Sequence, residues 1–264
     1  MSPEPAPDSS RDRERLAGGH YARKQIFCRS RVVAWSHGSR FDRARELVAP
    51  FAGGRLIDYG CGDGTFIAMV HGAFASVCGV DADAEQIEGC RTRLGDMPNV
   101  GFAHVTSLGP ADEGAWTVVT CMEVLEHCLE DERRAIIARL ARLVAPRGRV
   151  VISVPIETGP SLVGKQLVRA IAGMRGVGDY QHRERYSPIE MVRGLFGLPV
   201  PRAVYSTAAP GAGSYYGHKG FSWPDVQREV ESCLSIEERS FSPMPWSGAA
   251  LNSQVWFICR ARAS

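Results

Sequence analysis

Residues 55–65 read RLIDYGCGDGT, an apolar run that passes into a loop with three glycines. The run predicts a β-strand, and the residues that follow, 65–71, predict a helix. Glycines suit the turn between them because the chain must bend tightly and bring its backbone against a ligand without an intervening Cβ. This stretch therefore predicts a ligand-binding turn at the carboxyl end of a strand in an α/β protein.

A second signal is Asp81, which ends the next β-rich run, 76–81, roughly 20 residues after the glycines. A carboxylate at that place binds the ribose hydroxyls in proteins that hold nucleoside cofactors. The turn and the acid together favour a ligand that contains a nucleoside.

Short β-rich runs alternate with helical runs through the middle of the chain, a pattern typical of βαβ units and a parallel sheet. The predicted strands of this part are 55–59, 76–81, 100–105, 116–121 and 149–154. Residues 131–144 carry an apolar stripe at helical spacing, and Pro146 with Gly148 predict the end of that crossover helix.

The end of the chain predicts a helix at 222–233 and an antiparallel pair of strands, 236–242 and 254–260, at one edge of the sheet. We therefore expect an α/β fold with a Rossmann-like, doubly wound, mostly parallel sheet and an antiparallel last strand.

Three ordered stretches carry a resemblance to a known family: the D-x-G-x-G-x-G loop that begins at Asp58, the sequence Gly79-Val80-Asp81, and residues 120–127, TCMEVLEH. Together, over about residues 54–154, they resemble class I methyltransferases that depend on S-adenosylmethionine (SAM). Among these, the ubiquinone-biosynthesis O-methyltransferases have a similar M-E-x-L-E-H stretch after the fourth strand. The resemblance implies that the chain binds SAM and transfers its methyl group.

The resemblance also implies which residues contact the cofactor. The loop residues would hold its methionine part. The acid at the end of the second strand and the residue after it would hold the ribose. Residues after the third and fourth strands would flank the adenine and the remainder of the cofactor. In this sequence these residues are Asp58, Gly60, Cys61, Gly62, Gly64, Asp81, Ala82, Thr106, Ser107, Cys121, Met122 and Glu123. Many relatives have an acid after the third strand that contacts the adenine amino group. Here Thr106 or Ser107, or main-chain atoms, would replace it.

A nicotinamide dehydrogenase is the main alternative for a glycine-rich turn of this kind. Its fingerprint is G-x-G-x-x-G, whereas the spacing here is G-x-G-x-G with Asp58 before it. A carboxylate beside a pyrophosphate is unfavourable, so the sequence favours SAM over a dinucleotide.

The stretch after the fourth strand contains the candidate catalytic residues, His127 and Glu126. His127 can accept a proton near neutral pH, with Glu126 or Glu123 holding the orientation of its ring. The alternative is structural, with His127 capping or packing against the following helix.

The same residues form E-x-x-E-H and predict a divalent-cation site, because positions i, i+3 and i+4 face one side of a helix. In ubiquinone-type enzymes and in small-RNA 2′-O-methyltransferases, a similar stretch with a later histidine binds a metal. The tentative ligands here are Glu123, Glu126, His127 and His218, with His182 as another candidate for the later histidine. Similar stretches also occur in relatives without a metal.

The domain organisation follows from these assignments. We expect a disordered tail at 1–15, an N-terminal helical cap at 16–50, the SAM-binding core at 51–154, an inserted substrate lid at 155–219 and the end of the core sheet at 220–264. The insertion contains a predicted helix at 161–174, whose apolar face includes Val163, Leu167, Ile171 and Met174. Packing of this helix on the sheet is expected over binding to a membrane surface.

Composition limits the partners. An apolar fraction of 44%, a charged fraction of 23% and a net charge of +2 describe an ordinary soluble protein without a general basic surface for nucleic acid. The eight cysteines form no C-x-x-C pair, and no stretch is long and apolar enough to be a membrane span or a signal peptide. We therefore expect a cytoplasmic enzyme that methylates an oxygen, nitrogen or carbon of a small-molecule acceptor. The alternatives are a non-catalytic SAM sensor or scaffold and a metal-assisted RNA or quinone-type O-methyltransferase.

Overall fold

The computed structural model describes residues 10–28, 31–174, 185–206 and 214–262. The described chain forms two compact units. The first contains residues up to Thr120 together with Leu143–Gly148, and the second contains Cys121–Arg142 and Arg149 onward.

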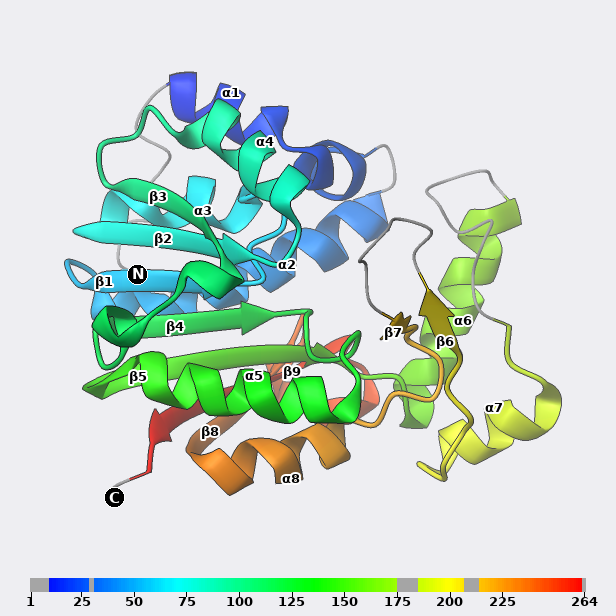
Figure 1. Cartoon of the computed structure of the whole chain (residues 1–264). Coiled ribbons are helices and arrows are strands. Elements are labelled where there is room, and N and C mark those ends of the chain that lie inside the picture. Colours follow the sequence, from blue (N-terminus) through cyan, green and yellow to red (C-terminus); the bar gives the residue numbers. More distant parts are fainter. Residues whose placement is uncertain (1–9, 29–30, 175–184, 207–213, 263–264) are drawn as a thin grey trace. The chain divides into compact units, whose positions relative to one another are not determined.

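Seven strands form one sheet in the order β3-β2-β1-β4-β5-β9-β8 (Figure 1). The strands are β1 (Arg55–Tyr59), β2 (Ser76–Asp81), β3 (Val100–His104), β4 (Trp116–Met122), β5 (Val144–Pro155), β8 (Leu234–Ser242) and β9 (Gln254–Ala261). β1 pairs in parallel with β2 and β4, and β2 pairs in parallel with β3. β9 runs antiparallel to both β5 and β8. The predicted fold class is confirmed, including the antiparallel last strand.

The boundary between α5 and β5 differs most from the prediction. α5 (Glu130–Leu143) passes directly into β5, so Pro146 and Gly148 lie inside the strand instead of closing a helix. A Cβ at Gly148 would lie 2.6 Å from the carbonyl oxygen of Thr117. The glycine there permits a close backbone approach, a requirement that the sequence does not distinguish from a helix stop.

In the first unit, α3 (Thr65–Val70) and α4 (Ala84–Leu94) follow β1 and β2. The N-terminal helices are α1 (Ser10–Gly18), the π-helical turn η1 (Ala22–Ile26) and α2 (Arg31–Val48). α1 packs against α3 and α4, and α2 packs against α3. α1 begins at Ser10, inside the segment expected to be a disordered tail, and Arg15 pairs with Asp96 beyond α4. The expected domain bounds stay a prediction.

In the second unit, α8 (Trp223–Cys233) contacts β8 and β9, and α5 lies beside it (Figure 1). The insertion contains α6 (Gly159–Met174), α7 (Pro188–Leu195) and a hairpin of β6 (Val204–Ser206) and β7 (Ser214–Tyr216). The sequence does not predict this hairpin. Its strands have three residues each and no apolar alternation, so they gave no periodic signal.

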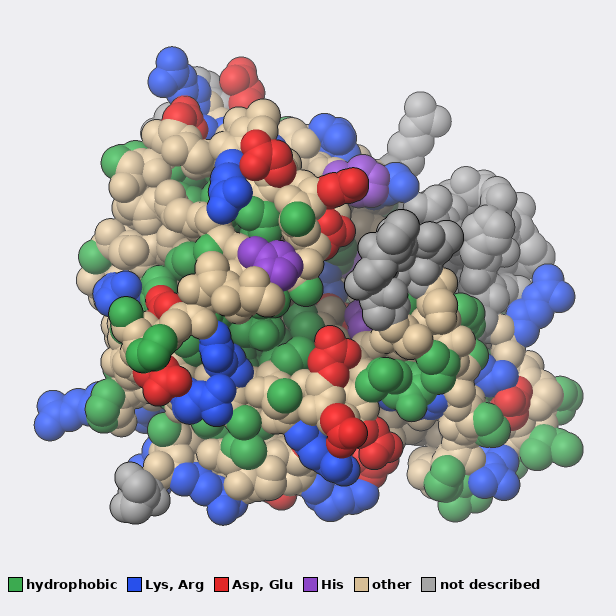
Figure 2. Space-filling view, in the orientation of Figure 1, with side chains coloured by type: hydrophobic (Ala, Val, Ile, Leu, Met, Phe, Trp, Pro, Cys, Tyr) green, Lys and Arg blue, Asp and Glu red, His purple; other side chains and the backbone are tan. Residues whose placement is uncertain are grey.

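The apolar face predicted for α6 is not a packing face where its side chains are described. Val163 and Leu167 are 42% and 61% exposed, whereas Leu162 is fully buried. Ile171 and Met174 lie outside the residues whose side chains are described. On the face of the molecule shown in Figure 2, acidic and basic side chains are interspersed, in keeping with the small net charge.

A salt bridge connects α5 and α8. Arg133 Nε and Nη2 each donate to a carboxylate oxygen of Glu229 at 2.6 Å, and the Arg133 side chain is only 6% exposed. Removal of one partner leaves the other as a buried, uncompensated charge.

We therefore expect Glu229→Ala to lower the free energy of unfolding by about 3–5 kcal/mol. The matched control is Asp225→Ala, which breaks the exposed Arg228–Asp225 pair on the same helix and is expected to cost under about 1 kcal/mol. Urea unfolding of both variants measures the difference. Equal losses of unfolding free energy in the two variants would show that the α5–α8 ion pair stabilises the protein no more than the exposed pair does.

Candidate active site

The turn after β1 has the backbone that its glycines predict. Gly60, Gly62 and Gly64 all have positive φ, at 78°, 52° and 71°. The amides of Gly60 and Cys61 donate to the carbonyl of Val80 at 2.7 and 3.1 Å, which fastens the turn to β2. Among the described residues other than its two chain neighbours, none has an atom within 4 Å of where a Cβ on Gly62 would be, which leaves space for a ligand on this side of the turn.

Asp81 ends β2 and faces the same turn. Its Oδ2 accepts the amide of Gly62 at 2.8 Å, and its Oδ1 accepts the amide of Asp83 at 2.9 Å. Asp83 in turn caps α4 by accepting the amides of Glu85 and Gln86. Each oxygen of a carboxylate has two lone pairs, so Asp81 retains the capacity to accept ribose hydroxyls.

Asp58 is a buried acid at the end of β1, 2% exposed, and Thr120 Oγ1 donates to its Oδ1 at 2.7 Å. Burial raises the pKa of Asp58 to about 7, because desolvation disfavours the carboxylate, and the negative charge of Asp81 raises it further. The bond from Thr120 acts in the opposite direction. A positively charged group of a ligand beside Asp58 would restore the carboxylate form.

The N-terminal helices reach this turn through Asp63. The amide of Tyr21 donates to Asp63 Oδ2 at 2.8 Å, while the hydroxyl and amide of Thr65 donate to Oδ1. The Tyr21 hydroxyl contacts His37 Nδ1 at 2.6 Å and accepts a bond from Arg40, which is only 8% exposed. The sequence does not indicate this cluster, because the N-terminal segment contains many arginines and nothing in their spacing distinguishes Arg40.

Thr106 and Ser107, expected near the adenine, contact His104, which the sequence did not indicate. His104 ends β3, and its Nε2 lies 2.9 Å from the carbonyl of Ala82, so Nε2 carries the proton and Nδ1 accepts from Thr106. Ser107 Oγ donates to the carbonyl of His104. The hydroxyls proposed for adenine recognition are thus already in contact with His104.

The residues expected after β4 belong to the second unit. Cys121 is buried in the strand, and Met122 is partly buried at its end. Glu123 has φ of 56°, a left-handed conformation that is uncommon for a residue other than glycine. Its amide donates to the carbonyl of Ser153 at 3.1 Å, which holds this backbone in place. Strained backbone of this kind is concentrated at functional sites.

The E-x-x-E-H stretch does not form the helix that the metal prediction assumed. Residues after Met122 form turns, the amide of His127 bonds to the carbonyl of Val124, and α5 begins only at Glu130. The prediction of one shared helical face is therefore wrong. A turn brings fewer side chains together than a helix face, and Glu123 is not part of the cluster that forms here.

Three of the four tentative metal ligands nevertheless meet. Ligand atoms of Glu126, His127 and His218 all lie within 4.8 Å of one another. The Glu126 side chain is fully buried and the His127 side chain is 40% exposed. The rings of His127 and His218 meet edge to face with centroids 4.8 Å apart. His182, the other candidate, lies outside the described residues.

The tautomer of His127 follows from its neighbour. His127 Nδ1 lies 3.0 Å from the carbonyl oxygen of Tyr216, which can only accept, so Nδ1 carries the proton. The lone pair is then on Nε2, 3.8 Å from Glu126 Oε1. A neutral imidazole with this tautomer presents Nε2 either to a metal or to a proton.

Comparisons with known proteins identify the family of this chain. A family model described as a methyltransferase domain matches residues 35–191. The chain is 31% identical over 176 residues to the ubiquinone biosynthesis O-methyltransferase of Thiobacillus denitrificans, covering 60% of this chain and 74% of that protein. The protein of the same name from Erwinia tasmaniensis is 35% identical over 117 residues, 43% of this chain and 47% of that protein.

A solved structure shares the fold at lower identity. The N-methyltransferase NodS of Bradyrhizobium japonicum, in complex with S-adenosyl-L-homocysteine, has a TM-score of 0.54 and 12% identity, covering 96% of this chain and 97% of that one. The sheet order, the glycine turn with Asp81 and these matches define a SAM-binding α/β protein. The chain belongs to the class I SAM-dependent methyltransferases. In the described part of the chain, no helix combines the length and the apolar character that crossing a membrane requires.

The raised pKa of Asp58 leads to a prediction about stability. The unfolded chain loses this proton near the ordinary value of 3.8, whereas the folded protein without cofactor retains it up to about pH 7. The stabilisation is therefore complete below about pH 4 and is lost as the pH rises through 7. A shift of this size corresponds to about 4 kcal/mol.

We expect the wild type to lose up to about 4 kcal/mol of unfolding free energy relative to Asp58→Asn between about pH 4 and pH 8. Urea unfolding across this range measures the difference. Asp131→Asn, which changes a fully exposed carboxylate, is the control and should follow the wild type. A constant difference between Asp58→Asn and the wild type would contradict the raised pKa.

Proposed function

We propose that this methyltransferase acts on a nucleophilic oxygen of a small-molecule acceptor, with the Glu126–His127–His218 cluster holding a divalent cation that assists the reaction. The curated relatives reported above are named O-methyltransferases, which supports an oxygen acceptor. The convergence of one carboxylate and two imidazoles within 4.8 Å is the observation that carries the cation.

SAM supplies a methyl group on a sulfonium, and the acceptor oxygen forms its bond to carbon as the carbon–sulfur bond breaks, with both electrons of that bond remaining on sulfur. The chain's part is to orient the reactants. The open side of Gly62 and the remaining lone pairs of Asp81 suit a nucleoside, and the buried Asp58 suits an ammonium group. These residues fit the methionine and ribose parts of the cofactor.

The donor set also indicates which cation fits. Magnesium prefers oxygen ligands in an octahedral arrangement, whereas zinc binds two histidines and one glutamate and keeps a fourth position open in several enzymes. Glu126 is a fully buried carboxylate, and a cation bound beside it would offset part of the cost of burying its charge. A zinc-like ion would supply Lewis acidity, which lowers the pKa of a hydroxyl bound to it.

His127 cannot both bind the cation and act as the general base. With Nδ1 donating to Tyr216, only Nε2 has a lone pair, and a nitrogen that binds a metal cannot also take a proton. If the cluster holds no metal, His127 with Glu126 is the candidate base. We favour the cation because His218 joins the cluster, which a base with one orienting carboxylate does not require.

The expected location in the cytoplasm and the expected absence of a nucleic-acid partner belong to the same proposal. They are supported by the small net charge and by the absence of disulfides among the described cysteines. A SAM sensor or scaffold and an RNA methyltransferase are the other candidates.

The acceptor is tested by incubation of the purified protein with SAM that carries an isotopically labelled methyl group and a metabolite extract, followed by mass spectrometry. We expect the label on the oxygen of a low-mass product. Label in added RNA would favour the RNA alternative. SAM binding without any labelled product from any extract would favour the sensor.

For the cofactor contacts, we expect Asp81→Ala to weaken SAM binding by about 10- to 150-fold, since hydrogen bonds to a charged group contribute about 1.5–3 kcal/mol. Calorimetry with SAM, S-adenosyl-L-homocysteine and NAD measures this. Unchanged SAM affinity in the variant, or NAD binding as tight as SAM, would contradict the assignment.

For the cation, we expect exhaustive chelation to remove activity and Zn²⁺ to restore it, with both Glu126→Gln and His218→Gln losing bound metal by elemental analysis while SAM binding persists. His20→Gln, a change in an exposed histidine outside the cluster, is the matched control. Full activity after chelation together with full activity of Glu126→Gln would eliminate the cation.

A further inference from the structure

The cluster is assembled from two segments that are far apart in the sequence. Glu126 and His127 come from the turns after β4, and His218 follows the hairpin strand β7. Two bonds pair the segments: the amide of Tyr216 donates to the carbonyl of His127 at 2.9 Å, and His127 Nδ1 donates to the carbonyl of Tyr216 at 3.0 Å. The geometry of the cluster therefore depends on what holds the hairpin segment against the turns.

One side chain bonds to both segments. Arg202 Nη2 donates to the carbonyl of Glu126, a member of the cluster, and to the carbonyl of Gly217 at 3.0 Å. Gly217 directly precedes His218. A single guanidinium nitrogen thus fixes the backbone at one ligand and next to another.

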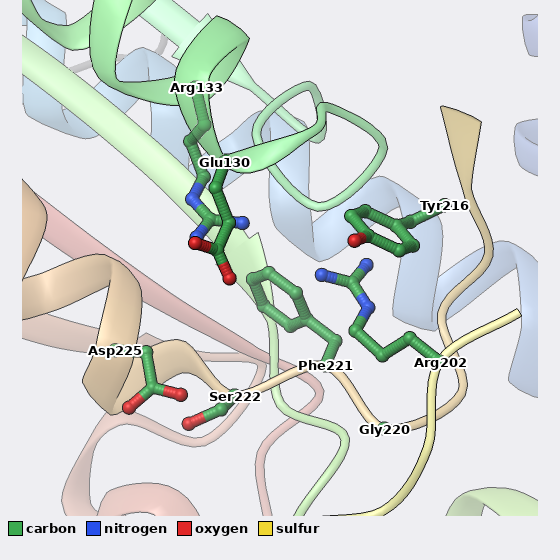
Figure 3. A pocket seen from close by; sticks show the side chains of 8 residues that line it. All are labelled: Glu130, Arg133, Arg202, Tyr216, Gly220, Phe221, Ser222 and Asp225. Carbon is green, nitrogen blue, oxygen red and sulfur yellow. The ribbon is translucent and has the colours of Figure 1, made fainter. Parts of the chain in front are cut away.

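Two aromatic rings hold this guanidinium in position. Arg202 Cζ lies 4.1 Å from the ring centroid of Tyr216 and 5.2 Å from that of the fully buried Phe221. Figure 3 shows the Arg202 group between the two rings. Gly220 permits this approach, because a Cβ there would lie 2.3 Å from the carbonyl oxygen of Val200 and 3.1 Å from Arg202 Cγ.

The small pocket beside Arg202 does not suggest a substrate site. It has a volume of about 90 Å³, and its lining includes Arg202, Tyr216, Phe221, Glu130 and Arg133 (Figure 3). Ligand pockets are typically about 300–1,000 Å³, so this one suits a few water molecules. Its arginines are also engaged, Arg133 with Glu229 and Arg202 with the two carbonyls.

The charge of Arg202 gives a further constraint. A guanidinium near a divalent cation repels it, so the charge alone would weaken metal binding. Any benefit of Arg202 to the cluster must come from its planar geometry, which lets it bond two carbonyls while lying against an aromatic face.

We propose that Arg202 is a positioning residue for the Glu126–His127–His218 cluster, aligning the two backbone segments that present the cation's ligands. This inference rests on the cation of the proposed function. The insertion, in which both Arg202 and His218 lie, would then complete the metal site.

The test uses Co²⁺ as a spectroscopic probe of the metal-depleted full-length protein, with affinity from chelator competition and geometry from the visible absorption bands. Arg202→Lys retains the charge and removes the planar group. We expect it to weaken Co²⁺ binding by about 10- to 100-fold, as for other residues that orient metal ligands, and to alter the bands while SAM affinity is unchanged. Arg202→Met should also weaken binding.

Arg193→Lys is the matched control, because Arg193 bonds to the carbonyl of Pro199 in the same insertion without touching the cluster. It should bind Co²⁺ as the wild type does. Wild-type affinity and bands in Arg202→Lys, or tighter binding in Arg202→Met, would overturn the role of Arg202 and leave the cation proposal standing. No Co²⁺ binding by the wild type would overturn the cation proposal and this inference with it.

Discussion

The bond from the amide of Gly62 to the carboxylate of Asp81 is the contact on which the cofactor end of the structure depends. It ties the turn after β1, in which Gly62 has a positive φ, to the end of β2. The same carboxylate accepts the amide of Asp83, which begins α4. One side chain therefore sets the turn, orients the next helix and keeps lone pairs for a ligand.

Two buried carboxylates lie at the proposed binding sites, one in each unit. Burial raises the pKa of Asp58 to about 7 in the protein without cofactor, so a cationic group bound beside it would favour the carboxylate at neutral pH. Glu126 is fully buried beside two histidines, an environment that suits a metal ion. Both sites hold acids at a cost in desolvation, and that cost is reduced by the positively charged partners that each is proposed to bind.

The insertion, residues 155–219, contributes a side chain to the Glu126–His127–His218 cluster. It supplies Arg202, Tyr216 and His218, and its hairpin is hydrogen-bonded to the backbone of the turns that carry Glu126 and His127. A change in this segment would therefore alter the geometry of the Glu126–His127–His218 cluster. The hairpin was not predicted because three-residue strands carry no periodicity.

The fold class and the glycine turn with Asp58 and Asp81 could be predicted from the residues alone, because strand periodicity and local backbone requirements are properties of neighbouring residues. The tentative ligands Glu123, Glu126, His127 and His218 came from the E-x-x-E-H motif and the family resemblance. The meeting of His218 with Glu126 and His127, without Glu123, and the contacts of Arg202, Arg40 and His104 are visible only in the folded chain. Those outcomes depend on contacts between distant segments and on turns in place of a helix after β4. Spacing along the chain cannot specify them, since it records only which residues are close in sequence.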